Sequence, residues 1–136
     1  MLVIDCSAVI DALVVPRDPR LVERLSRAKE LHAPHLLDVE LLHALRRLVA
    51  TGKLTRERAE YVREDFAALR IRRYAHHPFA DRIWALRDNL TAYDAAFVAL
   101  AEALAVPIVT CDARLASASA HQADVELFGG SATATG

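Results

Sequence analysis

Cysteine, lysine, glycine and long apolar runs are all scarce in this chain of 136 residues. The two cysteines, Cys6 and Cys111, lack the paired spacing of a zinc site and are too few for a disulfide framework. They are typical of small buried side chains in a reducing compartment. The longest apolar stretch, 95–109, is interrupted by Glu102 and Pro107, so we expect no membrane association through a spanning helix.

An excess of charge is also missing, because the formal net charge is −1. That balance argues against a strongly basic scaffold for nucleic acid. Lysine occurs only at Lys29 and Lys53, so arginine carries nearly all the positive charge. The arginine bias fits either a codon preference, given the abundant alanine, or the use of planar guanidinium groups on phosphate. The first residues contain no basic segment followed by an apolar leader, and we expect a cytoplasmic protein.

Short apolar runs alternate with helical periodicity, the pattern of an α/β fold with a parallel sheet. The expected strands are 2–5, 31–33, 71–74, 107–110 and 125–127. The expected helices are a short one that begins after Ser7 as its N-cap, and then 19–29, 36–50, 55–69, 78–89 and 93–104. Residues 1–128 show no internal linker or repeat, so we expect one domain. The segment 129–136 has no apolar periodicity, and we predict a flexible tail there.

Asp5 is the most informative single residue, because it ends the apolar run 2–4, which is typical of a buried parallel strand. An isolated carboxylate in such a place is costly unless it is hydrogen-bonded, paired or bound to a metal. One alternative needs no ligand, since the side chain could cap the next helix or accept hydrogen bonds around Ser7. Both interpretations stay open at this point.

Three other acids can each be explained either by a functional role or by a local structural role. Glu40 lies early in an apolar helix, where an acid near the positive end of the helix dipole is also favourable. Asp94 stands three residues after Thr91, which is the spacing of a capping box. Asp112 follows the fourth apolar run as Asp5 follows the first, and it could simply cap a short helix.

The four acids are nevertheless placed so that they can meet at one edge of the sheet. In an open parallel sheet, sites form at the carboxyl ends of the strands, around a topological switch point. Asp5 and Asp112 follow two strand ends, Glu40 lies early in the helix after the second strand, and Asp94 opens a later helix. Carboxylates about 4 Å apart repel by roughly 4 kcal/mol at an effective dielectric near 20, and a divalent cation removes that repulsion. Oxygen ligands favour Mg²⁺ or Mn²⁺ over zinc.

The residues around these acids resemble those of PIN-domain nucleases, and most of all the VapC toxins of type II toxin–antitoxin pairs. The resemblance covers the whole chain except the tail, and the block around Asp94 is its most specific part. The blocks that carry it are Val3-Ile4-Asp5-Cys6-Ser7-Ala8, Leu37-Asp38-Val39-Glu40-Leu41, the run from Leu90 to Glu102, and Val109-Thr110-Cys111-Asp112-Ala113-Arg114-Leu115. The resemblance implies a PIN-like three-layer α/β fold with a central, mostly parallel five-stranded sheet flanked by helices. It places the nuclease domain in residues 1–128.

The resemblance also implies a function, a toxin that hydrolyses RNA phosphodiester bonds as an Mg²⁺- or Mn²⁺-dependent endoribonuclease. Such an enzyme is implied to be a homodimer that a small cognate antitoxin inhibits. The implied catalytic residues are Asp5, Glu40, Asp94 and Asp112, with the metal on Asp5, Asp94 and Asp112 and with Ser7 and Thr110 as supporting hydroxyls.

RNA contacts and the number of metal ions are less defined. Ala113 stands where some relatives carry a further acid, which leaves one-metal and two-metal operation both open. Tyr93 could stack on a base, although packing beside Asp94 is an alternative role. The candidate RNA-contacting residues are Arg46, Arg47, Tyr93 and Arg114.

Two other functions share part of this pattern. A receiver domain also uses Mg²⁺ and acids at strand ends, but it needs neighbouring acids after the first strand and a late lysine. Here Asp5 is followed by Cys6, and no lysine lies beyond Lys53. A PIN nuclease that processes RNA without being a toxin would carry the same four acids, so the sequence separates it poorly from a toxin.

Overall fold

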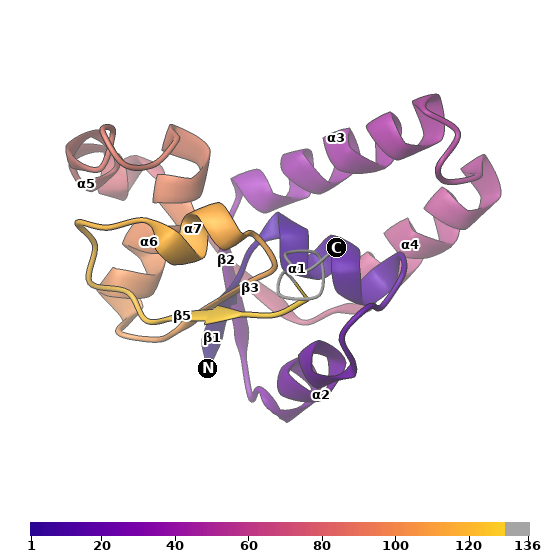
Figure 1. Ribbon diagram of the computed structural model, residues 1–136, viewed down its shortest axis with the longest axis horizontal. Coiled ribbons are helices and arrows are strands. Elements are labelled where there is room, and N and C mark those ends of the chain that lie inside the picture. Colours follow the sequence, from indigo (N-terminus) through magenta and orange to yellow (C-terminus); the bar gives the residue numbers. More distant parts are fainter. Residues whose placement is uncertain (130–136) are drawn as a thin grey trace.

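The computed structural model describes residues 1–129, which contain a five-stranded sheet of order β3-β2-β1-β4-β5 (Figure 1). Every neighbouring pair of strands is parallel, so the predicted α/β fold with a parallel five-stranded sheet is confirmed. Most of the predicted tail, 130–136, lies outside the described residues. The strands are β1 (Leu2–Ile4), β2 (Leu31–Pro34), β3 (Ile71–Tyr74), β4 (Ile108–Thr110) and β5 (Val125–Leu127).

Most helices lie close to their predicted positions, and the largest difference is in the fifth. The expected helix 78–89 is wrong as a single element, because Pro78 lies in a tight 3-10 turn and the helix after it already ends at Ala85. The chain then turns so that Leu86 and Leu90 are buried. The helices are α1 (Cys6–Leu13), α2 (Pro19–Arg27), α3 (Leu36–Ala50), α4 (Arg56–Ala68), the 3-10 turn η1 (His77–Phe79), α5 (Ala80–Ala85), α6 (Ala92–Leu104) and α7 (Ala113–Ser117).

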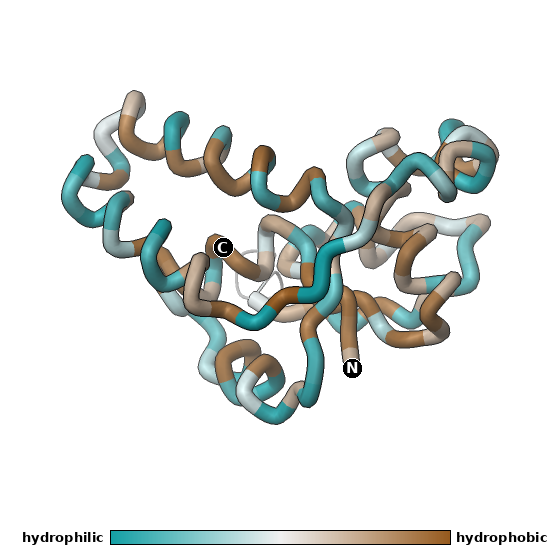
Figure 2. Tube along the Cα trace, turned by 180° about the vertical axis from the view of Figure 1, so that it is seen from behind, coloured by the Kyte–Doolittle hydropathy of each residue, from teal (hydrophilic) through white to brown (hydrophobic). Residues whose placement is uncertain are grey.

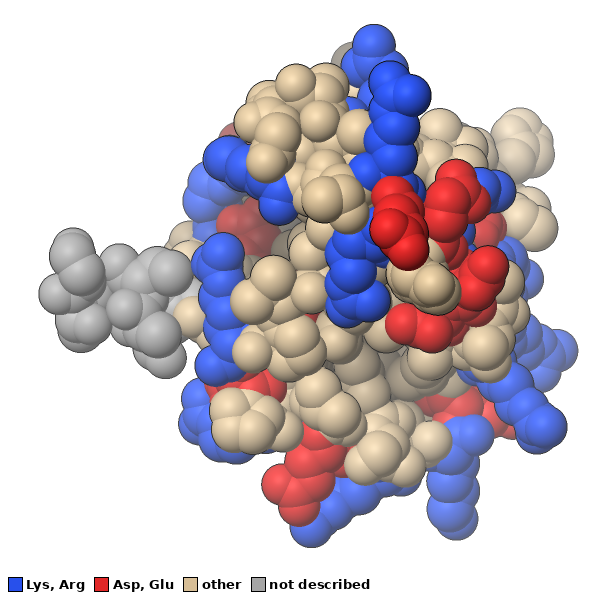
Figure 3. Space-filling model, turned by 90° about the vertical axis from the view of Figure 1, so that its right-hand side faces the viewer, with Lys and Arg blue, Asp and Glu red and all other residues tan. Residues whose placement is uncertain are grey.

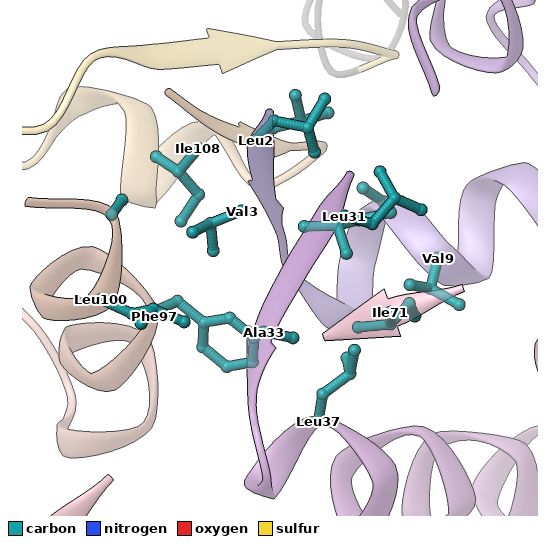
Figure 4. Close-up of a cluster of buried hydrophobic side chains, with 14 of the residues drawn as sticks. Leu2, Val3, Val9, Leu31, Ala33, Leu37, Ile71, Phe97, Leu100 and Ile108 are labelled. Carbon is teal, nitrogen blue, oxygen red and sulfur yellow. The ribbon is translucent and has the colours of Figure 1, made fainter. Parts of the chain in front are cut away.

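The sheet is covered on both faces, as the apolar composition of its strands requires. Helix α6 packs on β1, β2 and β4 from one side, and α1 packs from the other side, where it also meets α2, α3 and α4. Figure 4 shows Phe97 and Leu100 of α6 reaching the sheet from one side, while Val9 and Leu37 lie on the other. Burial of this apolar surface is the main stabilising contribution to the fold.

Helices α3 and α4 form an antiparallel hairpin that projects away from the sheet (Figure 1). Its connection contains Gly52 with a φ of +74°, a left-handed backbone that glycine adopts without steric cost. Along α3 the apolar and polar turns alternate in Figure 2, because Leu37, Leu41 and Leu45 form the buried stripe. Glu40 lies near the start of this helix, whose far end extends away from the sheet (Figure 1).

A topological switch point lies between β1 and β4, the central neighbours of the sheet. The chain leaves β1 for β2 on one side and returns later to β4 on the other, with Val3 opposite Ile108 and Ile4 opposite Val109. The carboxyl ends of β1 and β4 therefore diverge into α1 and α7 at the same edge. General rules for open parallel sheets predict a ligand site there. No helix within residues 1–129 has both the length and the apolar character needed to cross a membrane.

Candidate active site

Asp5 sits at the switch point and is almost completely buried. Its Oδ1 accepts hydrogen bonds from the Ser7 hydroxyl at 2.7 Å and from the Ala8 backbone N–H at 3.0 Å. Its Oδ2 accepts a hydrogen bond of 2.5 Å from the Thr110 hydroxyl on β4. A carboxylate has about four lone-pair positions, so these three donors leave one position open, on Oδ2. The side chain is thus fixed in one orientation with a single remaining acceptor.

The hydroxyls of Ser7 and Thr110 each have one proton, and both protons are used on Asp5. Their oxygens also accept, Ser7 from the Cys111 N–H at 2.9 Å and Thr110 from the Asp112 N–H at 2.9 Å. The 3.2 Å contact between the two hydroxyl oxygens is therefore a consequence of this packing and adds no donor. The network ties the start of α1 to the end of β4, with Asp5 at its centre.

Asp5 is also the N-cap of α1, through the hydrogen bond from Ala8. The prediction that Ser7 caps this helix is wrong, because the helix already begins at Cys6 and Ser7 lies in its first turn. Capping and a metal role are compatible, since the cap uses only one lone pair of the carboxylate. The alternative role considered for Asp5 is thus present in the structure, but it does not satisfy the whole side chain.

Glu40 reaches the same region from α3, and its Oε1 is buried without a hydrogen-bond partner in residues 1–129. The pKa of Glu40 is raised to about 7, mainly by burial and to a smaller extent by the charges of Asp94 and Asp5. Burial likewise raises the pKa of Asp5, with a smaller contribution from Asp94. The carboxylates of Asp5, Glu40 and Asp94 therefore belong to one electrostatic cluster.

Asp94 and Asp112 complete the acidic edge. Thr91 caps α6 by accepting a hydrogen bond from the Asp94 N–H at 3.2 Å, so the predicted cap is confirmed. Burial raises the pKa of the Asp94 carboxyl, and Asp112 raises it in turn. Asp112 caps α7 through the Arg114 N–H and also pairs with the Arg114 guanidinium at 3.4 Å. The Thr91 cap of α6 and the Asp112 cap of α7 are therefore both present.

This arrangement fits a hard divalent cation in its donor set. It offers carboxylate oxygens, an orphaned buried acceptor on Glu40, and an open lone pair on Asp5. Within residues 1–129, however, no three His, Cys, Asp or Glu side chains are grouped tightly enough to enclose an ion. A divalent cation at this edge would offset the repulsion between these carboxylates.

Comparison with known proteins decides the family. Residues 2–120 match the PIN domain family. Over 127 residues the chain is 38% identical to Ribonuclease VapC12 of Mycobacterium tuberculosis, with 93% of this chain and 98% of that protein covered. It is 42% identical to Ribonuclease VapC1 of the same organism, with 92% and 96% covered. This chain belongs to the VapC ribonucleases of the PIN-domain family.

Solved structures show the same fold at low sequence identity. PAE2754 from Pyrobaculum aerophilum is 17% identical and superposes with a TM-score of 0.68, covering 91% of this chain and 81% of that one. VapBC2 from Rickettsia felis, solved with a DNA fragment from its promoter, is 13% identical with a TM-score of 0.67, covering 93% and 97%. The receiver-domain alternative is wrong, since this VapC family fold has the order β3-β2-β1-β4-β5 instead of the receiver-like 2-1-3-4-5.

The predicted RNA-contacting residues of this VapC chain lie at different distances from the acids. Tyr93 directly precedes Asp94 and is exposed, and Arg114 extends into solvent beside Asp112. Arg47 shares the helix face of Glu40, but it is about 10 Å further along the α3 axis. Arg46 lines a groove between α3 and α4, away from that face. The hairpin end that faces the viewer in Figure 3 mixes basic and acidic side chains.

The sequence did not predict a pocket that lies beside the acids of this VapC chain. A pocket of about 490 Å³ lies where α5, η1 and the start of α6 meet, and Trp84 and Tyr93 line it. His76 and His77, interpreted as loop residues, border the same pocket. The only signal in the sequence was the presence of a single tryptophan close to the Asp94 block. The place of Trp84 in this pocket depends on how α5 packs on α6.

We expect the metal-free protein to lose stability as the pH rises, and Glu40 to be a main cause. Its pKa is raised to about 7 in the folded state, so between about pH 4.5 and 7 the folded chain holds more protons than the unfolded chain. Stability therefore falls through that window. Glu40→Gln should make the EDTA-treated protein about 1–2 kcal/mol more stable than wild type at pH 8, and no more stable at pH 4. Thermal unfolding at both pH values measures this difference.

Glu102→Gln is the matched control for that experiment. Arg82 forms two hydrogen bonds with the Glu102 carboxylate, at 2.8 and 2.9 Å, and lowers its pKa. Its stabilisation is present above the ordinary carboxyl pKa and is lost as the pH falls, the opposite sign to Glu40. Glu102→Gln should therefore destabilise the protein at pH 8. If both variants were destabilised at pH 8, the acids at the switch point would not be repelling one another.

Proposed function

We propose that this protein is an endoribonuclease that uses Mg²⁺ or Mn²⁺ to hydrolyse RNA phosphodiester bonds, as the toxin of a toxin–antitoxin pair. The proposal is carried by the buried Asp5 at the switch point, together with the buried Oε1 of Glu40, which has no hydrogen-bond partner within residues 1–129. Asp94 and Asp112 belong to the same electrostatic cluster. Membership of the VapC ribonucleases supports RNA as the substrate.

The acids divide into two groups by what they can do. Asp5, Asp94 and Asp112 are the proposed metal ligands, and Ser7 and Thr110 keep the Asp5 carboxylate in place. A bound divalent ion would supply an activated water and neutralise charge on the phosphate. Glu40 has a different task, since a carboxyl with a pKa of about 7 can accept a proton from an attacking water at neutral pH.

Exposed residues next to the acids would position the substrate. Arg114 is exposed beyond Asp112, where a guanidinium can contact the phosphate next to the scissile bond. Tyr93 presents an exposed ring directly before Asp94, which suits stacking on a base. Arg47, and more remotely Arg46, would contact RNA only where the strand continues along α3.

A small antitoxin protein and a second copy of the chain are the proposed protein partners. Solved structures with this fold include VapBC2 from Rickettsia felis and FitAcB from Neisseria gonorrhoeae, the latter with a TM-score of 0.65 over 92% of this chain. Exposed apolar side chains on α3, Val39 and Leu42, offer contact area for such partners. We further propose that residues 1–128 form the nuclease domain and that the protein acts in the cytoplasm.

The test of the activity is cleavage of total cellular RNA by the purified protein. We expect cleavage with Mg²⁺ or Mn²⁺, none with excess EDTA, and recovery when the metal is restored. A single-stranded DNA of matching sequence is the substrate control. Cleavage that persists unchanged in EDTA would contradict the metal-dependent mechanism, and cleavage of DNA alone would contradict the substrate.

A further inference from the structure

A pocket along α1 contains three charged side chains to which the proposed hydrolysis gives no role. Its volume is about 310 Å³, which is in the range of small-ligand sites. Side chains from α1, from the connections that follow α1 and α3, and from the end of β4 enclose it. We call it the Asp11 pocket. The lining residues that matter to the argument are Ser7, Asp11, Arg17, Leu48, Lys53 and Cys111.

One wall of the Asp11 pocket is part of the network that holds Asp5. Ser7 donates to Asp5 Oδ1 at 2.7 Å and accepts from the Cys111 N–H at 2.9 Å. Both Ser7 and Cys111 line the pocket, and Asp11 lies one helical turn after Ser7 on the same side of α1. The pocket therefore extends along α1 from the edge where the scissile phosphate is proposed to bind. A nucleotide next to the cleaved bond would enter it.

Asp11 is the unusual residue of the lining. Its Oδ2 is buried without a hydrogen-bond partner, and its carboxylate forms no ion pair within residues 1–129. Buried acceptors are normally paired, because an unpaired one has lost its water without replacement. A Cβ added to Gly129 would lie 3.6 Å from Asp11 Oδ1 and 3.7 Å from the Cys111 sulfur, so these two groups are near each other. Asp11 thus lacks donors at a place beside the Asp5 network.

Two cations line the same pocket and decide which ligand suits it. Arg17 on the α1–α2 connection and Lys53 on the α3–α4 connection are exposed, and neither forms an ion pair in the described part of the chain. The Lys53 N–H donates to the Leu48 carbonyl at 2.9 Å, which holds this turn in place. Two cations beside one carboxylate favour a ligand with negative charge and oppose a basic side chain of a protein partner. The ligand must therefore combine anionic groups with neutral N–H donors for Asp11, and an RNA nucleotide has both.

We infer that the Asp11 pocket binds a guanosine nucleotide of the RNA beside the cleaved bond, with Asp11 accepting from the guanine N1–H and 2-amino group and with Arg17 and Lys53 contacting phosphates. The inference rests on the proposed ribonuclease function and adds a base preference to it. Proteins read single-stranded RNA through hydrogen bonds to the exposed edges of its bases. Only guanine presents two adjacent donors on its Watson–Crick edge, and these match the two oxygens of a carboxylate. The terminal torsion of an aspartate is soft, so both Asp11 oxygens can turn toward the base.

Binding in the absence of cleavage is the first test. Fluorescently labelled oligouridylates that contain a single central guanosine, inosine or adenosine are titrated with the full-length protein in EDTA, and anisotropy gives the Kd. We expect the guanosine RNA to bind about 5- to 150-fold more tightly than the adenosine RNA. Inosine lacks only the 2-amino group, and its RNA should fall between the two. Asp11→Asn should bind the guanosine and inosine RNAs equally, whereas the wild-type comparison alone needs no variant that folds.

Cleavage gives a second readout with matched control variants. The ends of products from total cellular RNA should show guanosine at one fixed position beside the cleaved bonds for wild type and for Asp65→Asn, and Asp11→Asn should lose this preference. Lys53→Gln should weaken the binding of all RNAs alike and reduce the salt dependence, because it removes a phosphate contact. Lys29→Gln changes the other lysine of the chain, which does not line the pocket, and should have no such effect.

The outcomes separate this inference from the function on which it rests. Guanosine-selective binding that Asp11→Asn abolishes, without any cleavage in Mg²⁺ or Mn²⁺, would contradict the nuclease and leave the pocket standing. Cleavage with all four bases used equally, or with the guanosine preference kept in Asp11→Asn, would overturn the pocket alone. Loss of that preference in Arg17→Gln would show that Asp11 pairs with the arginine instead of a base. An oligoarginine peptide that binds through Asp11 more tightly than the guanosine RNA would place a basic protein segment there, and either result would overturn the inference.

Discussion

Asp5→Asn abolishes most RNA cleavage while the protein stays folded, with an expected loss of about 10²- to 10³-fold in rate. Asparagine keeps the size of the side chain and a carbonyl oxygen that can accept from the Ala8 N–H, so the cap of α1 survives. What disappears is the negative charge and the open lone pair on Oδ2, which together make the site attractive to a divalent ion. The loss should persist at saturating metal.

The control for this variant is Asp65→Asn, which removes the same charge from an exposed position on α4. It should cleave RNA at the wild-type rate with the same metal dependence. Circular dichroism and thermal unfolding of both variants exclude a folding defect as the cause. Full cleavage by Asp5→Asn would mean that the carboxylate at the switch point serves only as a helix cap.

Thr110→Val has the largest expected effect on stability among single changes at the site, about 2–4 kcal/mol. Valine matches the shape of threonine, so packing around the fully buried β4 position is preserved. The change removes the donor to Asp5 Oδ2 and the acceptor for the Asp112 N–H, leaving two buried polar groups without partners. A hydrogen bond to a charged group is worth more than a neutral one, which sets the size of the loss.

Ser7→Ala is the companion variant. It removes one donor to Asp5 Oδ1, which still accepts from the Ala8 N–H, and the position is only partly buried, so a smaller loss is expected. Chemical denaturation in EDTA ranks the two variants. A Thr110→Val protein as stable as wild type would show that the hydroxyl network does not hold Asp5, and the account of its orientation would be wrong.

The sequence was sufficient to predict the sheet and the edge on which the acids gather. Parallel strands end at the same edge, so an acid after the first and another after the fourth strand could be placed together without coordinates. Thr91, three residues before Asp94, likewise predicted the N-cap of α6 that the structure contains. In each case the decisive information is local, a residue type at a fixed distance from the end of an element.

What could not be predicted depends on neighbours that are remote in the sequence. The Thr110–Asp5 hydrogen bond exists because β1 lies beside β4, and only the strand order fixes that pairing. Ser7 was expected to be the N-cap, but the helix starts two residues earlier, and the Ser7 hydroxyl donates to Asp5. The Trp84 pocket depends on the break after Ala85, which the apolar pattern of that segment does not reveal.

The central claim is that the acids at the switch point form a divalent-cation site. Calorimetric titration of Mn²⁺ into the metal-free protein at neutral pH tests it most directly, with wild type, Asp5→Asn, Asp94→Asn and the control Asp65→Asn side by side. We expect at least one Mn²⁺ per chain for wild type and for Asp65→Asn, with release of a proton from Glu40, and greatly weakened binding in the other two variants. Equal Mn²⁺ binding by all four proteins, or none by wild type, would contradict the claim.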